Sequence, residues 1–271
     1  MGLFGILAGA GSGLLAGFVG SMLGLGGGFI LVPILNLGFG LPMVHAVGTS
    51  LSAIFFNGIS STAGYWRQGR IDFKLASCLI LPSTPTAILG GLVSNAVKQT
   101  TLTVIFSITL ALAAARMAAG KRKPAGGKDA EDAACRRLVD RCGTVFEYNV
   151  NLPLTVIAAA FAGFLGGMLG IGGGIVNVPV FIFCGLPVHL AVATSSFLII
   201  FNAASGAIPH AYIGNINYVL TAAIAPGVIL GAQLGAMASR RLKPGKLRLV
   251  LSVVLFALAM RMIARAFDFW M

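Results

Sequence analysis

Residues 17–33 of the chain read GFVGSMLGLGGGFILVP, and residues 163–179 read GFLGGMLGIGGGIVNVP. Eleven of the 17 paired positions are identical. The likeness continues after one deletion, because a Leu-Pro, a Thr-Ser and an Asn follow in the same order in both halves. They are Leu41-Pro42, Thr49-Ser50 and Asn57 in the first half, and Leu186-Pro187, Thr194-Ser195 and Asn202 in the second. This duplication predicts a chain built from two copies of one structural unit.

The composition indicates a membrane protein. Hydrophobic residues make up 57% of the 271 residues and charged residues only 10%, against roughly 25% charged in a soluble domain. Several apolar runs have about 20 residues, the length of a helix that spans a bilayer. The alternating segments of about ten residues that a membrane β-barrel requires are absent from the sequence. The predicted class is therefore an all-α polytopic membrane protein.

The net charge of +12 comes from basic residues that gather in short loops between the apolar runs. That distribution favours a role in topology and contact with anionic lipid over binding of nucleic acid. The runs themselves divide the chain into segments. They are a broken stretch from Leu3 to Gly40, Val44 to Tyr65, Leu75 to Val97, Thr101 to Ala119, a broken stretch from Leu152 to Cys184, Val188 to Tyr212, Tyr218 to Ser239 and Leu247 to Ala266.

Three regions follow from this division: a membrane repeat at 1–120, a charged linker at 121–149 and a second membrane repeat at 150–271. Residues 121–147 carry seven Lys or Arg and five Asp or Glu. We expect this linker to be cytoplasmic and to contain a short amphipathic helix near Ala130 to Val139. It separates two repeats that each contain one broken hairpin and three helices.

Loop charges predict that the two repeats are inverted. The loop at 66–74 is basic, whereas the matching loop at 212–218 carries no charge. The loop around Lys98 has one lysine, whereas its counterpart at 240–248 has five basic residues. The positive-inside rule places basic loops in the cytoplasm. All of these loop charges satisfy the rule if each repeat crosses the membrane five times and both termini lie outside. Arg261 and Arg265 near the C-terminus run against this arrangement.

The consecutive glycines predict a break in each hairpin near the membrane midplane. Each glycine disfavours a helix by roughly 1 kcal/mol relative to alanine, and the opened backbone must be buried in protein or line a cavity. Free N–H groups there, with the positive end of a following half-helix, would bind an anion. The alternative is close helix packing, because Gly20, Gly24 and Gly28 are spaced four apart.

Polar side chains repeated inside the apolar runs complete the predicted substrate site. The hydroxyls of the Thr-Ser pairs would contact an oxyanion or cap a helix, and the asparagines would contact a ligand or form an interhelical hydrogen bond. Asn177 stands where the first repeat has Leu31, so the halves differ there. No Asp or Glu lies mid-membrane, which suits an anionic substrate. The candidate residues are Gly26, Gly27, Gly28, Thr49, Ser50, Asn57, Gly172, Gly173, Gly174, Asn177, Thr194, Ser195, Asn202 and Gln233.

The pattern GxxGxxxGxGGGxxxVP in both halves, followed by LP, TS and N, resembles the sulfite exporter TauE/SafE family, also called the TSUP permeases. The resemblance covers about residues 8 to 268. It implies an inner-membrane permease for sulfite, organosulfonates such as sulfoacetate, or related sulfur oxyanions. By motif position, the resemblance implies that the family's substrate site includes residues 26–28, residues 172–174 and the two Thr-Ser pairs.

The expected function is therefore a secondary transporter of small sulfur-containing anions that works by alternating access between two inverted repeats. The alternatives are an anion channel and a transporter of another small anion or organic acid. An enzyme is not expected, because the membrane runs hold no GxSxG, HExxH or His/Asp cluster. We expect no cofactor or metal, a monomer or homodimer in the cell inner membrane, and protons as a candidate coupling ion.

Overall fold

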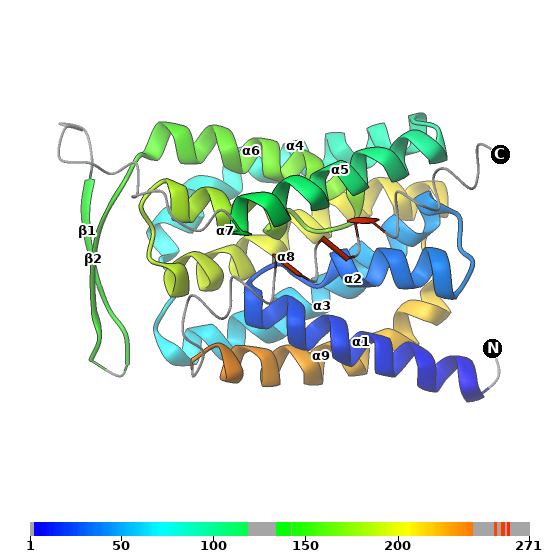
Figure 1. Cartoon of the computed structure of the whole chain (residues 1–271), viewed down its shortest axis with the longest axis horizontal. Helices are drawn as coiled ribbons and strands as arrows, with labels where there is room; N and C mark the ends of the chain where they lie inside the picture. Colours follow the sequence, from blue (N-terminus) through cyan, green and yellow to red (C-terminus); the bar gives the residue numbers. More distant parts are fainter. Residues whose placement is uncertain are drawn as a thin grey trace.

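A computed structural model describes residues 3–118, 134–141 and 143–240, with six positions between 252 and 260. These residues form helices and one two-stranded sheet (Figure 1). The elements are α1 (Leu3–Leu23), α2 (Gly28–Pro33), the π-helix η1 (Ile34–Gly38), α3 (Met43–Gln68), α4 (Phe73–Ala96), α5 (Gln99–Ala118), β1 (Ala134–Val139), β2 (Val145–Val150), α6 (Leu152–Leu169), α7 (Gly174–Phe183), α8 (Val188–Ile213) and α9 (Tyr218–Ser239).

Six of these helices are long and apolar enough to cross a membrane: α1, α3, α4, α6, α8 and α9. The helical segments Gly28–Gly38, Gln99–Leu112 and Gly174–Phe183 are apolar but shorter. The predicted class, an all-α multi-pass membrane protein, is confirmed. The last expected run, Leu247 to Ala266, lies largely outside the described residues, so the count of ten segments stays a prediction.

The helix boundaries follow from short polar and glycine signals. α4, α6 and α9 each begin after a side chain that accepts a backbone hydrogen bond three residues on: Asp72 caps Leu75, Asn151 caps Leu154 and Asn217 caps Leu220. α3 ends at Gly69 and α8 at Gly214, both in the left-handed conformation that glycine adopts without strain. The segments that follow, Gly69 to Phe73 and Gly214 to Tyr218, read GRIDF and GNINY.

Helices of the two halves alternate in the bundle (Figure 1). α1 packs along α9, α4 packs along α6, and α3 packs against α8 between these outer pairs. Each outer pair thus joins the first long helix of one half to the third long helix of the other. Glycines make the close approach: a side chain on Gly227, Gly231 or Gly235 would strike the α1 backbone. These three glycines, also spaced four apart, therefore let the two helix backbones pack closely.

The linker forms a β-hairpin where an amphipathic helix was expected near Ala130 to Val139. Residues 130–133 lie outside the described part, but 134–139 form β1, which pairs antiparallel with β2. The turn is closed by Asp140, whose carboxylate accepts from the Thr144 amide at 2.9 Å, and by Gly143 at φ 80°. VFEYNV in β2 alternates, with Tyr148 and Val150 buried. That period of two favours a strand, so the helix expectation was wrong.

Candidate functional site

The helix breaks at the two glycine motifs depend on backbone conformations that other residues rarely adopt. In the first break Gly24, Gly26 and Gly27 have φ of 72°, 81° and 84°. The second break repeats them, with 75°, 68° and 82° at positions 170, 172 and 173. Side chains are disfavoured at such angles by steric contact with the backbone. The repeated glycines are therefore a backbone requirement as well as a packing feature.

The two breaks lie against each other at the centre of the bundle. A side chain on Gly28 would strike the Gly170 carbonyl and reach 2.7 Å from Ile171 Cα, and a side chain on Gly174 would lie 2.7 Å from the Gly24 carbonyl. The predicted meeting of the glycine motifs is seen in these contacts. Whether it coincides with the membrane midplane stays a prediction.

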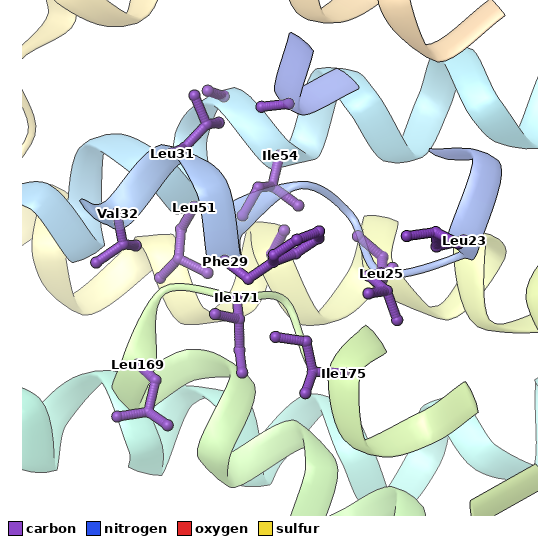
Figure 2. Packing of buried hydrophobic residues seen from close by; sticks show 14 of the residues in the cluster. Leu23, Leu25, Phe29, Leu31, Val32, Leu51, Ile54, Leu169, Ile171 and Ile175 are labelled. Atoms are coloured by element: carbon purple, nitrogen blue, oxygen red, sulfur yellow. The ribbon is translucent and has the colours of Figure 1, made fainter. Parts of the chain in front are cut away.

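Apolar side chains fill the crossing of the breaks (Figure 2). Leu25 and Phe29 from the first break lie near Ile171 and Ile175 from the second, and all four are fully buried. Gly26 and Gly172 both face Ile54 of α3 and the matching Ile199 of α8. The described arrangement is therefore tightly packed at its centre, and it would have to loosen to admit a polar molecule.

The Thr-Ser pairs connect each half to the break of the other half. Ser50 donates its hydroxyl to the Gly170 carbonyl at 2.8 Å, and Ser195 donates to the Gly24 carbonyl at the same distance. The threonines accept instead of donating. Thr49 accepts from the Asn217 amide at 3.1 Å, and Thr194 accepts from the Asp72 amide at 3.2 Å. These hydroxyls hold the breaks and the loops in place.

The asparagines of the two halves differ in their contacts. Asn57 donates its amide to the Gly26 carbonyl at 2.5 Å. Asn202, at the matching position, has no hydrogen-bond partner for either side-chain atom among the described residues. Its nitrogen lies 3.1 Å from where a side chain on Gly173 would begin. Asn177 is likewise buried, and the described part of the chain offers no partner to either of its polar atoms.

Gln233 has a different neighbourhood from the other candidates. Its amide donates to the Ser60 carbonyl at 2.9 Å and so joins α9 to α3. Ser60 in turn donates to the Ile229 carbonyl at 2.8 Å. Gln233 therefore lies in the α3–α9 interface. The other candidates lie at the breaks or at the start of α3 and α8.

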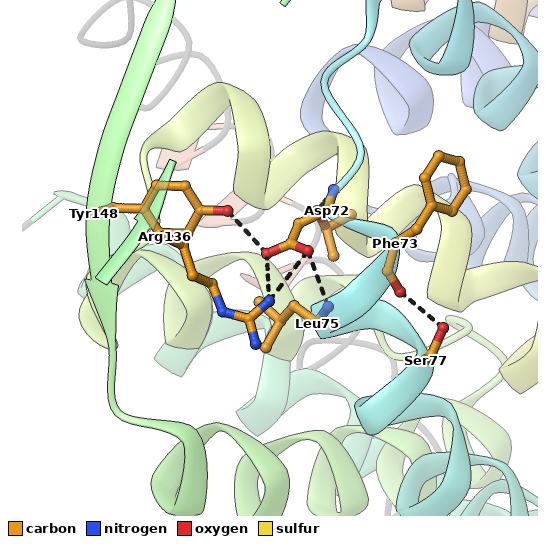
Figure 3. A network of polar contacts seen from close by, with 7 residues as sticks. Asp72, Phe73, Leu75, Ser77, Arg136 and Tyr148 are labelled. Carbon is orange, nitrogen blue, oxygen red and sulfur yellow. Dashed lines mark hydrogen bonds and ion pairs between the residues drawn. The ribbon is translucent and has the colours of Figure 1, made fainter. Parts of the chain in front are cut away.

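A polar cluster that sequence reasoning missed joins the linker hairpin to the start of α4 (Figure 3). The Asp72 carboxylate accepts hydrogen bonds from Arg136 of β1 at 3.0 Å and from the Tyr148 hydroxyl of β2 at 2.8 Å. It also accepts from the backbone amide of Leu75, in the first turn of α4, at 2.9 Å. Beside it, Arg70 pairs with Asp140 at 3.1 Å. Burial, and then the neighbouring Asp72, raise the pKa of Tyr148, so its hydroxyl stays a proton donor.

This cluster, Asp72–Arg136–Tyr148, places the hairpin across one end of the bundle (Figure 1). The backbone amide of Asp72 also reaches Thr194, so the hairpin is connected through one residue to the second Thr-Ser pair. The signal that could have identified it is the repeat of GRIDF and GNINY, which marks Asp72 and Asn217 as matched loop residues. Among the described residues, no group of three His, Cys, Asp or Glu is placed to hold a metal ion.

Comparison with known proteins agrees with this architecture. The family model described as Sulfite exporter TauE/SafE matches residues 9–262. The probable membrane transporter protein YunE of Bacillus subtilis is 32% identical over 260 residues, which cover 93% of this chain and 94% of YunE. The probable membrane transporter protein MJ0441 of Methanocaldococcus jannaschii is 30% identical over 266 residues, covering 93% and 92%.

A plant protein matches a shorter part. The sulfite exporter TauE/SafE family protein 6 of Arabidopsis thaliana is 31% identical over 75 residues, 28% of this chain and 18% of that protein. No solved structure matches the chain. The full-length family match and the two broken, glycine-rich hairpins lead to one conclusion: the chain belongs to the sulfite exporter TauE/SafE family and is a multi-pass membrane transporter.

Proposed function

We propose that this transporter is a secondary carrier of small sulfur-containing anions such as sulfite or organosulfonates. The observation that carries the proposal is the contact between the two breaks, each held by a serine of the opposite half. Irregular backbone at membrane depth is tolerated where it is buried or lines a cavity, and matched helix breaks are typical of transporter substrate sites. The family name supports the sulfur oxyanion as substrate class.

The chemistry of the breaks favours an anion over a cation. The described membrane-spanning helices contain no Asp or Glu, so a buried cation would find no carboxylate partner. A new helix begins at each break, and the first backbone amides of that helix have no carbonyl within the helix to bond to. Such amides, with the partial positive charge of the helix end, stabilise negative charge. In this proposal the fourteen predicted residues form or support the site, with Gln233 acting at the α3–α9 interface.

We further propose that the two halves are inverted and rock against each other during transport. Contacts made by one half recur in the other with the partners exchanged, as in Ser50 to Gly170 and Ser195 to Gly24. The basic linker hairpin and the start of α1 lie at opposite ends of the bundle (Figure 1). This supports a cytoplasmic linker and an outer N-terminus. We propose the cell inner membrane as the location. Opening would require the apolar crossing of Leu25, Phe29, Ile171 and Ile175 to separate.

The proposal is tested by uptake of radiolabelled sulfite into proteoliposomes that contain the purified full-length protein. Unlabelled sulfate, thiosulfate, sulfoacetate and taurine serve as competitors, together with the simple carboxylates acetate and succinate. We expect uptake well above that of protein-free vesicles, with competition from the small sulfur anions. Uptake of none of these anions above the protein-free background would reject the substrate class. Competition by carboxylates alone would assign the transporter to organic acids.

A further inference from the structure

We infer that the substrate-binding groups are concentrated in the second half, at the start of α7, where Asn177 and Asn202 would line the pocket that forms when the packed centre loosens. This inference rests on the proposed anion transport and assigns its binding residues. The first half, by contrast, supplies a structural counterpart of the same shape. At matched positions of the two breaks the backbone is alike and the side-chain chemistry differs.

In the first half the polar side chain at the break is already engaged. Asn57 donates to the Gly26 carbonyl and lies next to Gly27. One helical turn beyond Gly27 the chain has Leu31, which is buried and apolar. Apart from the oxygen of Asn57 and the backbone amides of Gly28 and Phe29, which within the described chain are as free as their counterparts in the second half, the first break therefore presents a satisfied side-chain amide and an aliphatic side chain.

In the second half the same positions carry four unpaired polar atoms. Asn202 reaches Gly173, the residue that precedes α7, and Asn177 stands one turn beyond it in α7. Their exposed fractions are 0% and 1%, and none of their amide nitrogens or oxygens has a partner within the described residues. A buried polar group left unpaired costs roughly 1–3 kcal/mol. Native structures rarely keep several such groups together unless a ligand, ion or water satisfies them.

The start of α7 adds further donors to the same place. α7 has ten residues, and its first intrahelical bonds are donated by Val176 and Asn177, both to the Gly173 carbonyl. The preceding amides of Gly174 and Ile175 donate to no carbonyl of the described chain. The Asn202 side chain and two backbone amides thus lie at the helix end that carries partial positive charge, and Asn177 stands one turn further on. These are neutral donors of the kind that bind oxyanion oxygens.

The chemistry of this pocket selects the charge of its ligand. The residues named here include no Lys or Arg, and the free energy of moving an ion out of water rises with the square of its charge. A neutral pocket therefore favours a singly charged oxyanion over a dianion. The two amide oxygens are acceptors, and a protonated oxyanion such as hydrogen sulfite can donate its single hydrogen to one of them. We assign the pocket to singly charged oxyanions, with hydrogen sulfite preferred to sulfate.

The test uses the change Asn177→Leu, which gives the second half the residue that the first half has at this position. Thermal unfolding of the purified full-length protein is followed in detergent, with and without sulfite in slightly acidic buffer, and with sulfate. Wild-type protein is expected to be stabilised by sulfite more than by sulfate. In Asn177→Leu the ligand-free melting temperature stays level or rises, while affinity for sulfite falls ~10-fold or more. Leu31→Met, at the matched position, keeps the wild-type response.

A second variant, Asn202→Ala, keeps the test valid if Asn177→Leu does not fold. Asn202→Ala removes no hydrogen bond and should keep its melting temperature while losing the response to sulfite. Asn57→Ala removes the bond to Gly26 and should melt at a lower temperature. If wild-type protein and both second-half variants respond equally to sulfite, the amides hold only water or one another, and the inference is wrong. If wild-type protein neither binds nor transports any oxyanion, the proposed function itself fails.

Discussion

Replacing Gly28 by alanine is expected to force the two glycine breaks apart. The new Cβ would lie 2.5 Å from the Ile54 Cδ1 atom and 2.7 Å from Ile171 Cα, and it would strike the Gly170 carbonyl. Ordinary contacts begin at about 3.4 Å, so the backbones must separate by ~0.7 Å or more. Overpacking of this kind costs about 1–3 kcal/mol. The φ of Gly28 is not in the left-handed region, so the expected loss is steric.

The matched control is Gly11→Ala in α1, where no atom lies within 4 Å of the new side chain. This change should stabilise the helix by about 0.5–1 kcal/mol. The two variants should therefore differ by about 2–4 kcal/mol, measured as thermal or denaturant unfolding in detergent. Gly174→Ala, with backbone contacts at 2.7 Å, should behave like Gly28→Ala. If Gly28→Ala unfolds at the same temperature or denaturant concentration as Gly11→Ala, the breaks do not hold the halves together as described.

Two further predictions concern side chains. Arg136→Gln, which removes the ion pair to Asp72 at the start of α4, should lower the free energy of unfolding by about 1–3 kcal/mol. Arg137→Gln, on an exposed pair at 3.8 Å, should leave it unchanged. Equal melting of the two variants would show that the Arg136 ion pair contributes no stability. Ser50→Ala and Ser195→Ala each leave a buried carbonyl of the opposite break without its donor and should destabilise by about 1–3 kcal/mol. A loss in one serine variant only would contradict the equivalence of these two contacts.

Several parts of the fold were predictable because their cause is local. Glycines at 24, 26 and 27 require positive φ, and their repetition at 170, 172 and 173 marked both breaks correctly. Long apolar runs predicted α3, α4, α8 and α9 closely. The hairpin was missed because a short amphipathic helix was expected near Ala130 to Val139, and the period of two in VFEYNV, which forms β2, was not used.

The contacts across the halves were beyond local reasoning. Ser50 and Gly170 are 120 residues apart, and no pattern in the sequence indicates that the hydroxyl of one repeat meets the break of the other. The contacts of the two asparagines were not predictable from the sequence either. Asn57 and Asn202 occupy matched positions in nearly identical motifs, yet within the described part of the chain only the Asn57 side chain has a hydrogen-bond partner. Such a difference depends on sub-ångström backbone placement, which residue identity does not encode by itself.

The most direct test of the central claim, a carrier that alternates access to one anion site, is counterflow. Proteoliposomes are loaded with unlabelled sulfite, diluted into a trace of radiolabelled sulfite, and followed over time. The account predicts transient accumulation of label above its equilibrium level, because the loaded carrier returns faster when its site is occupied. Asn177→Leu should abolish this overshoot. A monotonic approach to equilibrium that is insensitive to internal sulfite, accompanied by a large ionic current, would contradict the carrier and indicate an anion channel.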